Sequence, residues 1–327
     1  MKILIIKLGA LGDVVRTLSI LQGIKENYPD SDISWVTKNN AIDIFEGNPY
    51  VKNIFTIPYK TEEEFDILYN FDIEKEATEL AIKIKANKKY GFYSEGGYPA
   101  AFNLGAEYYL STIFDDELKK NNKKTYQEMI FDAAELKYKK QSFSIYLNEK
   151  DKKYAENFLK INGMNQNNLI GIHIGSSPRW PSKAWDTGKI IEFIVKLKEK
   201  RYNVIVFAGY DDKEKQAEIA REVKKFGLQV FYNNPNNTIK EFASLINLCK
   251  KIVCADSLAL HISLALKKPT IALFFCTSPD EVEGYDLLKK IVSPMLKEFF
   301  PERMDEYDKE LINSINADTV LEAVLNE

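Results

Sequence analysis

The sequence predicts an α/β protein with two Rossmann-like domains, each a parallel sheet covered by helices. Short apolar runs alternate with helical patterns, and the alternation starts anew after a charged helix near the middle of the chain. The length of 327 residues, of which 45% are hydrophobic, is enough to bury two cores. We place the first domain at 1–148 and the second at 149–301. The acidic remainder, 302–327, is expected to end in a helix that packs back towards the first domain.

The first series opens with an apolar run that is typical of a buried parallel strand. A glycine-containing turn and a helical pattern that stops at Pro29 follow it. The expected elements are strands at 2–6, 32–36, 53–57 and 65–71 and helices at 14–28, 73–86 and 125–137. Residues 92–125 have weaker periodicity, and we expect loops and short helices there.

The second series repeats this architecture without a recognisable repeat in sequence. It alternates apolar runs and helical patterns, so a second parallel sheet is expected. The expected elements are strands at 169–174, 203–208, 228–231, 251–255 and 270–275 and helices at 149–163, 186–200, 211–226, 238–249 and 257–267.

Charge and cysteine usage exclude several classes of protein. The 45 basic and 48 acidic residues give a net charge of −3, which disfavours a strongly basic nucleic-acid binder. Cys249, Cys254 and Cys276 form no paired CxxC motif, so neither a zinc site nor a disulfide framework is indicated. No signal peptide is recognisable, and no apolar run approaches the about 18 residues of a membrane span. We therefore expect a cytoplasmic protein with reduced thiols.

The first candidate site is the turn after the first strand. Gly9 and Gly12 allow close approach of the backbone to a ligand, and the helix start offers free N–H groups. The spacing is GxxGD, so the GxGxxG dinucleotide fingerprint is absent and a nicotinamide dehydrogenase is disfavoured. Asp13 is expected at the N-cap position. There it either caps the helix or acts as a general base at the carboxyl end of the strand.

The second candidate site is the turn after the apolar run that ends at residue 174. The small residues Gly175, Ser176 and Ser177 permit a phosphate to meet backbone N–H groups. Arg179 and Lys183 carry charges that can neutralise it. The structural alternative is a surface loop whose tryptophans pack on the domain body.

The third candidate site lies between a buried strand and a helix. Ser257 is expected to cap that helix, whose positive end would hold a pyrophosphate beside Asp256. His261 lies one turn inside the helix, where a packed, hydrogen-bonded histidine is the more common outcome. Because His173 is the one other histidine, a multi-histidine metal site is excluded, whereas a carboxylate-only metal site stays open. Thr277 follows the last strand and either lies at the same edge or forms a simple turn.

Together these motifs resemble glycosyltransferase family 9, the ADP-heptose:lipopolysaccharide heptosyltransferases, over nearly the whole chain. The resemblance is carried, in order, by the stretches KILIIKLGALGDVVRTL, HIGSSPRWPSKAW and CADSLALHISLALKKPTIALFFCTSP. It implies a GT-B fold, in which two Rossmann-like domains face each other across a cleft, with the acceptor on the N-terminal domain and ADP-heptose on the C-terminal one. It also implies inversion at the anomeric carbon with neither metal nor cofactor.

The resemblance assigns roles to individual residues. Asp13 matches the proposed base that takes the proton of the acceptor hydroxyl, and Lys183 matches the basic residue that meets the donor phosphates. The remaining assignments are Gly175, Ser176, Ser177, Arg179, Asp256, Ser257, Leu258, His261 and Thr277 on the donor side and Gly9, Gly12 and Arg16 on the acceptor side. The chain departs from the family pattern at Leu258, where many members have glycine, and at Arg16, where the best-known branch has histidine. It departs again at Phe275 and Cys276, where Gly-Pro is usual.

The expected partners are a nucleotide sugar, with ADP-heptose as the expected donor, and a glycan or glycolipid acceptor of the lipopolysaccharide core. No nucleic acid is expected, and contact with the inner face of the cytoplasmic membrane would be peripheral. Two alternatives stay open. One is a GT-B transferase or sugar epimerase that uses a UDP or GDP sugar, and the other is a nucleotide-sugar-binding module without turnover.

Overall fold

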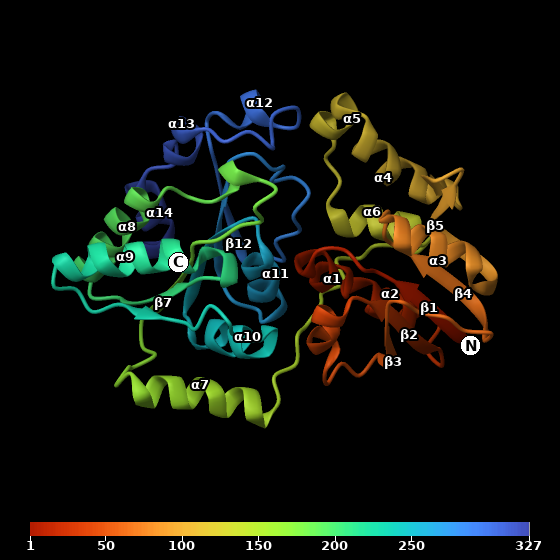
Figure 1. Cartoon of the computed structure of the whole chain (residues 1–327), viewed down its shortest axis with the longest axis horizontal. Helices are drawn as coiled ribbons and strands as arrows, with labels where there is room; N and C mark the ends of the chain where they lie inside the picture. Colours follow the sequence, from red (N-terminus) through yellow and green to blue (C-terminus); the bar gives the residue numbers. More distant parts are fainter. Residues whose placement is uncertain (327) are drawn as a thin grey trace. The chain divides into compact units, whose positions relative to one another are not determined.

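The computed structural model describes residues 1–326, and the chain divides into two compact units. The first unit comprises Met1–Tyr146 together with the short segment Asp280–Glu283. The second comprises Leu147–Pro279 and the residues from Gly284 onward. Strands and helices alternate in both units (Figure 1), which confirms the predicted α/β class.

The first unit is built on a sheet with the strand order β3-β2-β1-β4-β5-β6. Neighbouring strands are parallel except for the antiparallel pair β5 and β6. The strands are β1 (Lys2–Ile6), β2 (Asp32–Thr37), β3 (Val51–Thr56), β4 (Glu64–Asn70), β5 (Lys85–Glu95) and β6 (Tyr98–Ala101). The helices are α1 (Leu11–Thr17), α2 (Ser19–Asn27), the 3₁₀ helix η1 (Asn39–Phe45), α3 (Lys75–Lys83), α4 (Leu104–Phe114), α5 (Asp116–Asn121) and α6 (Tyr126–Ala133).

The central strand of this sheet is apolar because helices cover both of its faces. Residues 3–6 of β1 are completely buried. Leu4 and Ile6 belong to one core cluster with Ala77 and Leu80 of α3, while α6 packs on both α1 and α2. A strand that is buried on both faces has a continuous apolar run instead of alternation, which is the pattern of residues 3–6.

Two parts of the first unit differ from the expectation. The helix expected at 14–28 is two helices, α1 and α2, which meet at Leu18. The β5–β6 hairpin lies where the end of a helix and loops were expected, and that expectation is wrong. Residues 85–95 form a strand of mixed burial next to the edge of the sheet, so their many lysines hide the strand pattern. The hairpin turns at Gly96 and Gly97, whose positive φ values of 57° and 90° suit glycine.

The second unit is built on a parallel sheet with the strand order β12-β11-β10-β7-β8-β9. The strands are β7 (Leu169–His173), β8 (Asn203–Phe207), β9 (Phe231–Tyr232), β10 (Lys251–Ala255), β11 (Thr270–Phe274) and β12 (Leu288–Val292). The α-helices are α7 (Glu149–Ile161), α8 (Thr187–Glu199), α9 (Lys213–Lys225), α10 (Ile239–Leu248), α11 (Leu258–Ala265), α12 (Leu296–Phe299), α13 (Lys309–Asn313) and α14 (Ala317–Leu325). Short 3₁₀ helices are η2 (Pro181–Lys183) and η3 (Tyr210–Asp212). Strand β12 was not expected, because the series was expected to close at β11.

The C-terminal helix packs within the second unit. Val320 and Val324 of α14 lie in the same core cluster as Ile190 and Phe193 of α8. Figure 1 shows α14 beside α8, and α7 beside α10. The amphipathic pattern of residues 302–327 predicts this buried face without identifying which sheet it covers.

Both sheets have the same strand order when each is counted from its own first strand. In each, the first strand lies between the second and the fourth, so the connections leave it in opposite directions. Ligands of open parallel sheets bind beyond the carboxyl ends of the strands at this point. The fold therefore directs attention to the ends of β1 and β4 in the first unit and of β7 and β10 in the second. No helix within residues 1–326 is long and apolar enough to cross a membrane.

Candidate functional site

The second unit brings one basic and two other titratable side chains together beyond β7 and β10. Lys183 belongs to η2, and its Nζ lies 3.0 Å from Oδ2 of Asp256, which follows β10 directly. His261 of α11 is buried, with Nε2 3.8 Å from Oδ1 of the same aspartate. Asp256 thus lies between a cation and a histidine at the carboxyl edge of the sheet. A lysine at this edge can bind an anionic group of a ligand.

The end of β7 and the turn after β10 also meet, through His173 and Ser257. Ser257 occupies the N-cap position of α11, as expected, but its hydroxyl makes no capping hydrogen bond. Its Oγ instead lies 3.4 Å from Nδ1 of His173. Burial and the nearby Lys215 ammonium lower the pKa of His173 to about 4, although a hydrogen bond with the Gly175 backbone acts in the opposite direction. The ring is therefore neutral at pH 7.

Gly175 is tightly packed against the next loop of the unit. A Cβ built on Gly175 would lie 1.8 Å from Oδ2 of Asp212, the last residue of η3. Burial raises the pKa of Asp212, an effect that Lys215 opposes. The Lys215 ammonium donates to the carbonyls of Ile174 (3.1 Å) and Trp185 (2.8 Å). The small residue after β7 therefore leaves room for a carboxylate, and Lys215 ties both ends of the 174–185 loop together.

Other predicted donor-side residues lie in the loop after β7 or beyond β11. Ser176 is half-buried and Ser177 is exposed in the loop after β7. Arg179 is exposed and stacks on its neighbour Trp180, with the guanidinium carbon 4.7 Å from the ring centroid. Thr277 lies beyond β11 and is buried, and its hydroxyl has no hydrogen-bond partner within residues 1–326.

Leu258 is the first residue of α11 and is half-buried. It follows Ser257 directly, so its backbone lies at the helix start although its side chain departs from the family pattern. The first N–H groups of a helix lack partners inside the helix and can donate to an anion. A leucine at this position therefore leaves the backbone donor in place.

In the first unit, Asp13 lies inside the first turn of helix α1 and not at the N-cap, where it was expected. Helix α1 starts at Leu11 with Ala10 as its N-cap, so Asp13 is the third helical residue and does not cap the helix. Gly12 is the residue before it. The carboxylate of Asp13 pairs with Nη2 of Arg16 at 2.8 Å and is about one-third exposed. It therefore remains accessible to a substrate while a guanidinium holds it.

Arg16 is in turn held by the aromatic ring of Tyr126. Its guanidinium carbon lies 3.7 Å from the ring centroid, within the range of a cation–π contact. The phenol oxygen of Tyr126 lies 2.6 Å from Oγ1 of Thr17, which also donates to the carbonyl of Asp13. Helix α6 thus fixes the side of α1 that bears Asp13 and Arg16.

Sequence reasoning missed one charged residue near this turn. Asp72 follows β4, the neighbour of β1, and its Oδ2 lies 3.5 Å from Nζ of Lys7. The same oxygen accepts the backbone N–H groups of Leu8 and Gly9. The sequence signal that could have identified it is its position directly after a buried strand, since such positions line the ligand edge of a parallel sheet.

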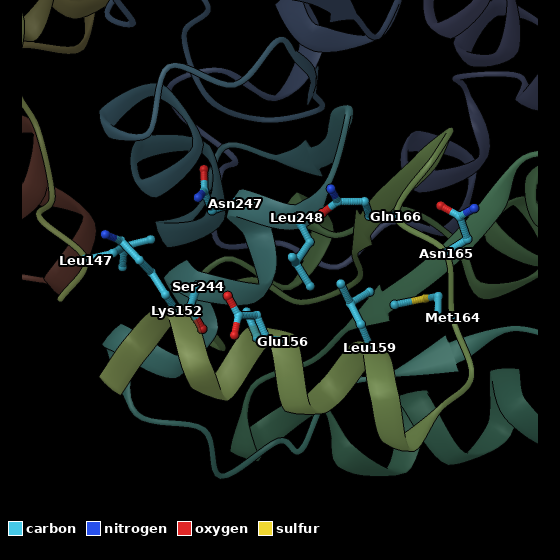
Figure 2. A pocket seen from close by; sticks show the side chains of 11 residues that line it. Leu147, Lys152, Glu156, Leu159, Met164, Asn165, Gln166, Ser244, Asn247 and Leu248 are labelled. Atoms are coloured by element: carbon cyan, nitrogen blue, oxygen red, sulfur yellow. The ribbon is translucent and has the colours of Figure 1, made fainter. Parts of the chain in front are cut away.

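A cavity of about 600 Å³ in the second unit lies away from these residues. Figure 2 shows Leu159 of α7 and Leu248 of α10 pointing into it, together with Met164. Residues 164–166 precede β7, and Leu248 precedes β10, so the cavity opens at the amino edge of the sheet. The titratable cluster lies at the carboxyl edge. This cavity is therefore no part of the candidate site.

Comparison with known proteins places the chain in a family. The sequence model of glycosyltransferase family 9 (heptosyltransferase) matches residues 61–306, about three quarters of the chain. The chain is 24% identical to lipopolysaccharide heptosyltransferase 1 of Campylobacter coli, over 99% of this chain and 98% of that protein. The family match includes Lys183 and Asp256, and the similarity to the Campylobacter protein extends to the N-terminal region that contains Asp13.

Solved structures show the same fold. The glycosyl transferase family 9 protein of Veillonella parvula has a TM-score of 0.78 at 18% identity, covering 99% of this chain and 96% of that one. The ADP-heptose lps heptosyltransferase II of E. coli has a TM-score of 0.72 at 17% identity, covering 99% and 98%. These similarities confirm the predicted GT-B fold. The chain belongs to glycosyltransferase family 9 and is a glycosyltransferase.

Proposed function

We propose that the protein transfers heptose from ADP-heptose to a sugar of the lipopolysaccharide core, with inversion at the anomeric carbon. The observation that carries this proposal is the Lys183–Asp256–His261 cluster at the carboxyl edge of the second unit. The Campylobacter relative bears the name of a lipopolysaccharide heptosyltransferase, and the E. coli structure that of an ADP-heptose enzyme. Both names support a heptose donor and a lipopolysaccharide acceptor.

The second unit is proposed to bind the donor. The ammonium of Lys183 would neutralise the diphosphate, and the backbone N–H groups at the start of α11 would donate to it. The buried hydroxyl of Thr277 is a further donor for the same group. As the sugar–diphosphate bond breaks, negative charge accumulates on the departing ADP. Positively charged and N–H groups placed there stabilise the transition state more than the ground state.

Asp13 is proposed to act as the general base. The acceptor hydroxyl oxygen attacks the anomeric carbon, a new C–O bond forms, and the bond to the diphosphate breaks. The hydroxyl proton passes to the Asp13 carboxylate, and ADP leaves with the bonding electron pair. Gly9 and Gly12, which precede this carboxylate in sequence, and Arg16, which pairs with it, are proposed to border the acceptor. We place the reaction in the cytoplasm or at the inner face of the cytoplasmic membrane. Fractionation of host cells tests this location.

A transfer assay tests the function directly. The purified protein is incubated with ADP-heptose and a lipopolysaccharide core that lacks heptose, and ADP release, product mass and the anomeric configuration by NMR are measured. The expected product carries one heptose with the configuration opposite to that of the donor. Asp13→Ala is expected to lower the transfer rate by about 10²- to 10⁴-fold while ADP binding is retained. Asp30→Ala, which removes an exposed carboxylate after α2, is the matched control.

Two results would redirect the assignment. Tighter binding of UDP or GDP than of ADP, ranked by calorimetry, would indicate a transferase or epimerase with another nucleotide sugar. Binding of ADP-heptose without any glycoside product, in wild type and with a native acceptor, would indicate a binding module without turnover.

A further inference from the structure

The carboxylate of Asp72 organises the turn between β1 and α1. Its Oδ2 accepts the N–H groups of Leu8, at 2.8 Å, and of Gly9, while its Oδ1 accepts the N–H of Glu74 at 2.9 Å. Lys7 Nζ lies 3.5 Å from Oδ2 and donates to the carbonyl of Phe71 at 3.2 Å. One side chain therefore fixes two consecutive backbone N–H groups of the turn and the lysine that precedes them.

The Lys7–Asp72 pair is buried, and the opposite charges offset the effect of burial on both pKa values. The side chains of Lys7 and Asp72 are 6% and 2% exposed. Burial alone would lower the pKa of Lys7, but the nearby Tyr126, Asp72 and Asp13 together raise it. Burial alone would raise the pKa of Asp72, but Lys7 and the backbone donors lower it. Both groups are therefore charged at neutral pH. Asp13 is close enough to Lys7 for its charge to contribute.

The turn held by Asp72 determines where α1 begins. It ends at Ala10, whose carbonyl accepts the N–H groups of Asp13 at 2.8 Å and of Val14 at 3.1 Å. A change in the path of residues 7–10 would therefore move the first turn of α1 and with it the carboxylate of Asp13. Buried ion pairs are often no more stabilising than apolar side chains of similar volume, so the need for stability alone does not explain a buried charge pair here.

We propose that Asp72, together with Lys7, is a positioning residue that holds Asp13 in place for the proposed transfer. The inference rests on the proposed function, in which Asp13 is the base. Asp72 does not itself touch substrate in this proposal. Its effect reaches the reaction through the backbone of Leu8 and Gly9 and through the start of α1.

The test measures kcat and KM for Asp72→Asn. Asparagine is nearly isosteric but carries no charge, so it holds Lys7 and the two N–H groups less strongly. We expect kcat to fall by about 10- to 100-fold, since a displacement of about 1 Å of a reacting group has effects of this size. KM for ADP-heptose and the Kd of ADP should stay within about twofold, because the second unit is unchanged. Asp66→Asn is the matched control, since Asp66 lies on β4, which Asp72 follows, and accepts the exposed N–H of Lys2.

A double variant separates positioning from general stability. In an Asp13→Ala background no base remains to be positioned, so Asp72→Asn should lower the residual rate by less than about twofold. An equal loss in both backgrounds would overturn the positioning role, and so would a wild-type kcat for Asp72→Asn.

Gly9→Ala carries the same test if Asp72→Asn does not fold. A Cβ at Gly9 would lie 3.1 Å from both Asp72 Oδ2 and Lys7 Nζ, so it presses on the pair without removing either charge. We expect a smaller loss of kcat at saturating acceptor, about 2- to 10-fold, with unchanged ADP binding. A wild-type kcat for Gly9→Ala would count against the proposal. A wild-type protein that forms no glycoside at all would overturn the proposed function instead, since the positioning role is judged relative to an active wild type.

Discussion

Lys183 Nζ lies 3.0 Å from Asp256 Oδ2, and the two side chains are 14% and 16% exposed. The lysine that is proposed to meet the donor diphosphate is thus paired with a carboxylate. A pair shielded from water interacts more strongly than one on the surface. The Asp256 carboxylate therefore keeps the Lys183 ammonium at the carboxyl edge of the sheet, where the ammonium can also bind a phosphate group.

Removal of the Lys183 charge should weaken binding of ADP. Lys183→Ala is expected to raise the Kd of ADP by about 10- to 100-fold, because a hydrogen bond to a charged group contributes about 1.5–3 kcal/mol. Calorimetry at low and high salt measures this, and the difference from wild type should shrink as salt is added. Lys200→Ala, which removes an exposed lysine of the same unit, is the control and should leave the Kd unchanged. Equal Kd values for Lys183→Ala and wild type would exclude a role in phosphate binding.

The same pair should show coupling in stability. Lys183→Met leaves Asp256 without its cation, and Asp256→Asn leaves Lys183 without its carboxylate. The losses of unfolding free energy in the two single variants should add up to more than the loss in the double variant. The difference, which is the coupling energy of the pair, is expected to be about 1–2 kcal/mol. Denaturation by urea measures the four proteins. Additive losses would mean that the two side chains contribute independently.

Gly175 is expected to tolerate no side chain. Gly175→Ala would place a Cβ 1.8 Å from Oδ2 of Asp212, so the carboxylate or the loop must move. We expect a loss of about 1–3 kcal/mol in the free energy of unfolding, the usual range for overpacking, and weaker binding of ADP. Thermal or urea denaturation measures the first effect and calorimetry the second.

Two further variants test the cause of that loss. Gly209→Ala is a matched control, because its Cβ would lie 3.7 Å from the same oxygen, which is an ordinary contact. It should cost much less than Gly175→Ala. Shortening the obstructing side chain in the double variant Gly175→Ala/Asp212→Ala should recover part of the lost stability. If the second substitution recovers nothing, the contact with Asp212 is not the cause.

The sequence predicts the strongly periodic elements well and the edges of the sheets poorly. Residues 3–6 and 252–255 are buried on both faces, so their apolar runs are unambiguous. Strand β5 carries Lys85, Lys88 and Lys89 and lies next to the edge strand of the sheet. Most of its side chains are exposed or only partly buried, so the strand has no continuous apolar run. Strand β12 is an edge strand with two lysines in its middle. Long-range pairing decides such segments, and local composition does not reveal it.

The candidate site divides in the same way. Lys183 and Asp256 lie in turns that follow apolar runs, so their place at one sheet edge follows from the strand order. Their roles came from the resemblance to the family. Asp72 was missed because nothing local connects it with Lys7, far away in sequence. Only the pairing of β1 with β4 brings the two together. The N-cap expected at Asp13 was wrong because the backbone enters the helix at Leu11, before the acidic residue.

His173 should make stability depend on pH below neutrality. Burial and the nearby Lys215 lower its pKa from the ordinary 6.5 to about 4 in the folded protein. The unfolded chain therefore binds a proton more readily than the folded one between these values. The contribution is fully present above about pH 6.5 and is lost as pH falls towards about 4, with a loss of about 2 kcal/mol at pH 5. Urea denaturation at pH 5 and pH 7.5 measures this loss.

Other carboxylates titrate over the same range, so the informative quantity is the difference between wild type and His173→Gln, which cannot take up the proton. The variant should lose about 2 kcal/mol less than wild type between the two pH values. Equal losses would mean that the His173 ring accepts a proton as easily in the folded protein as in the unfolded chain, and that its contact with Ser257 does not require the neutral ring.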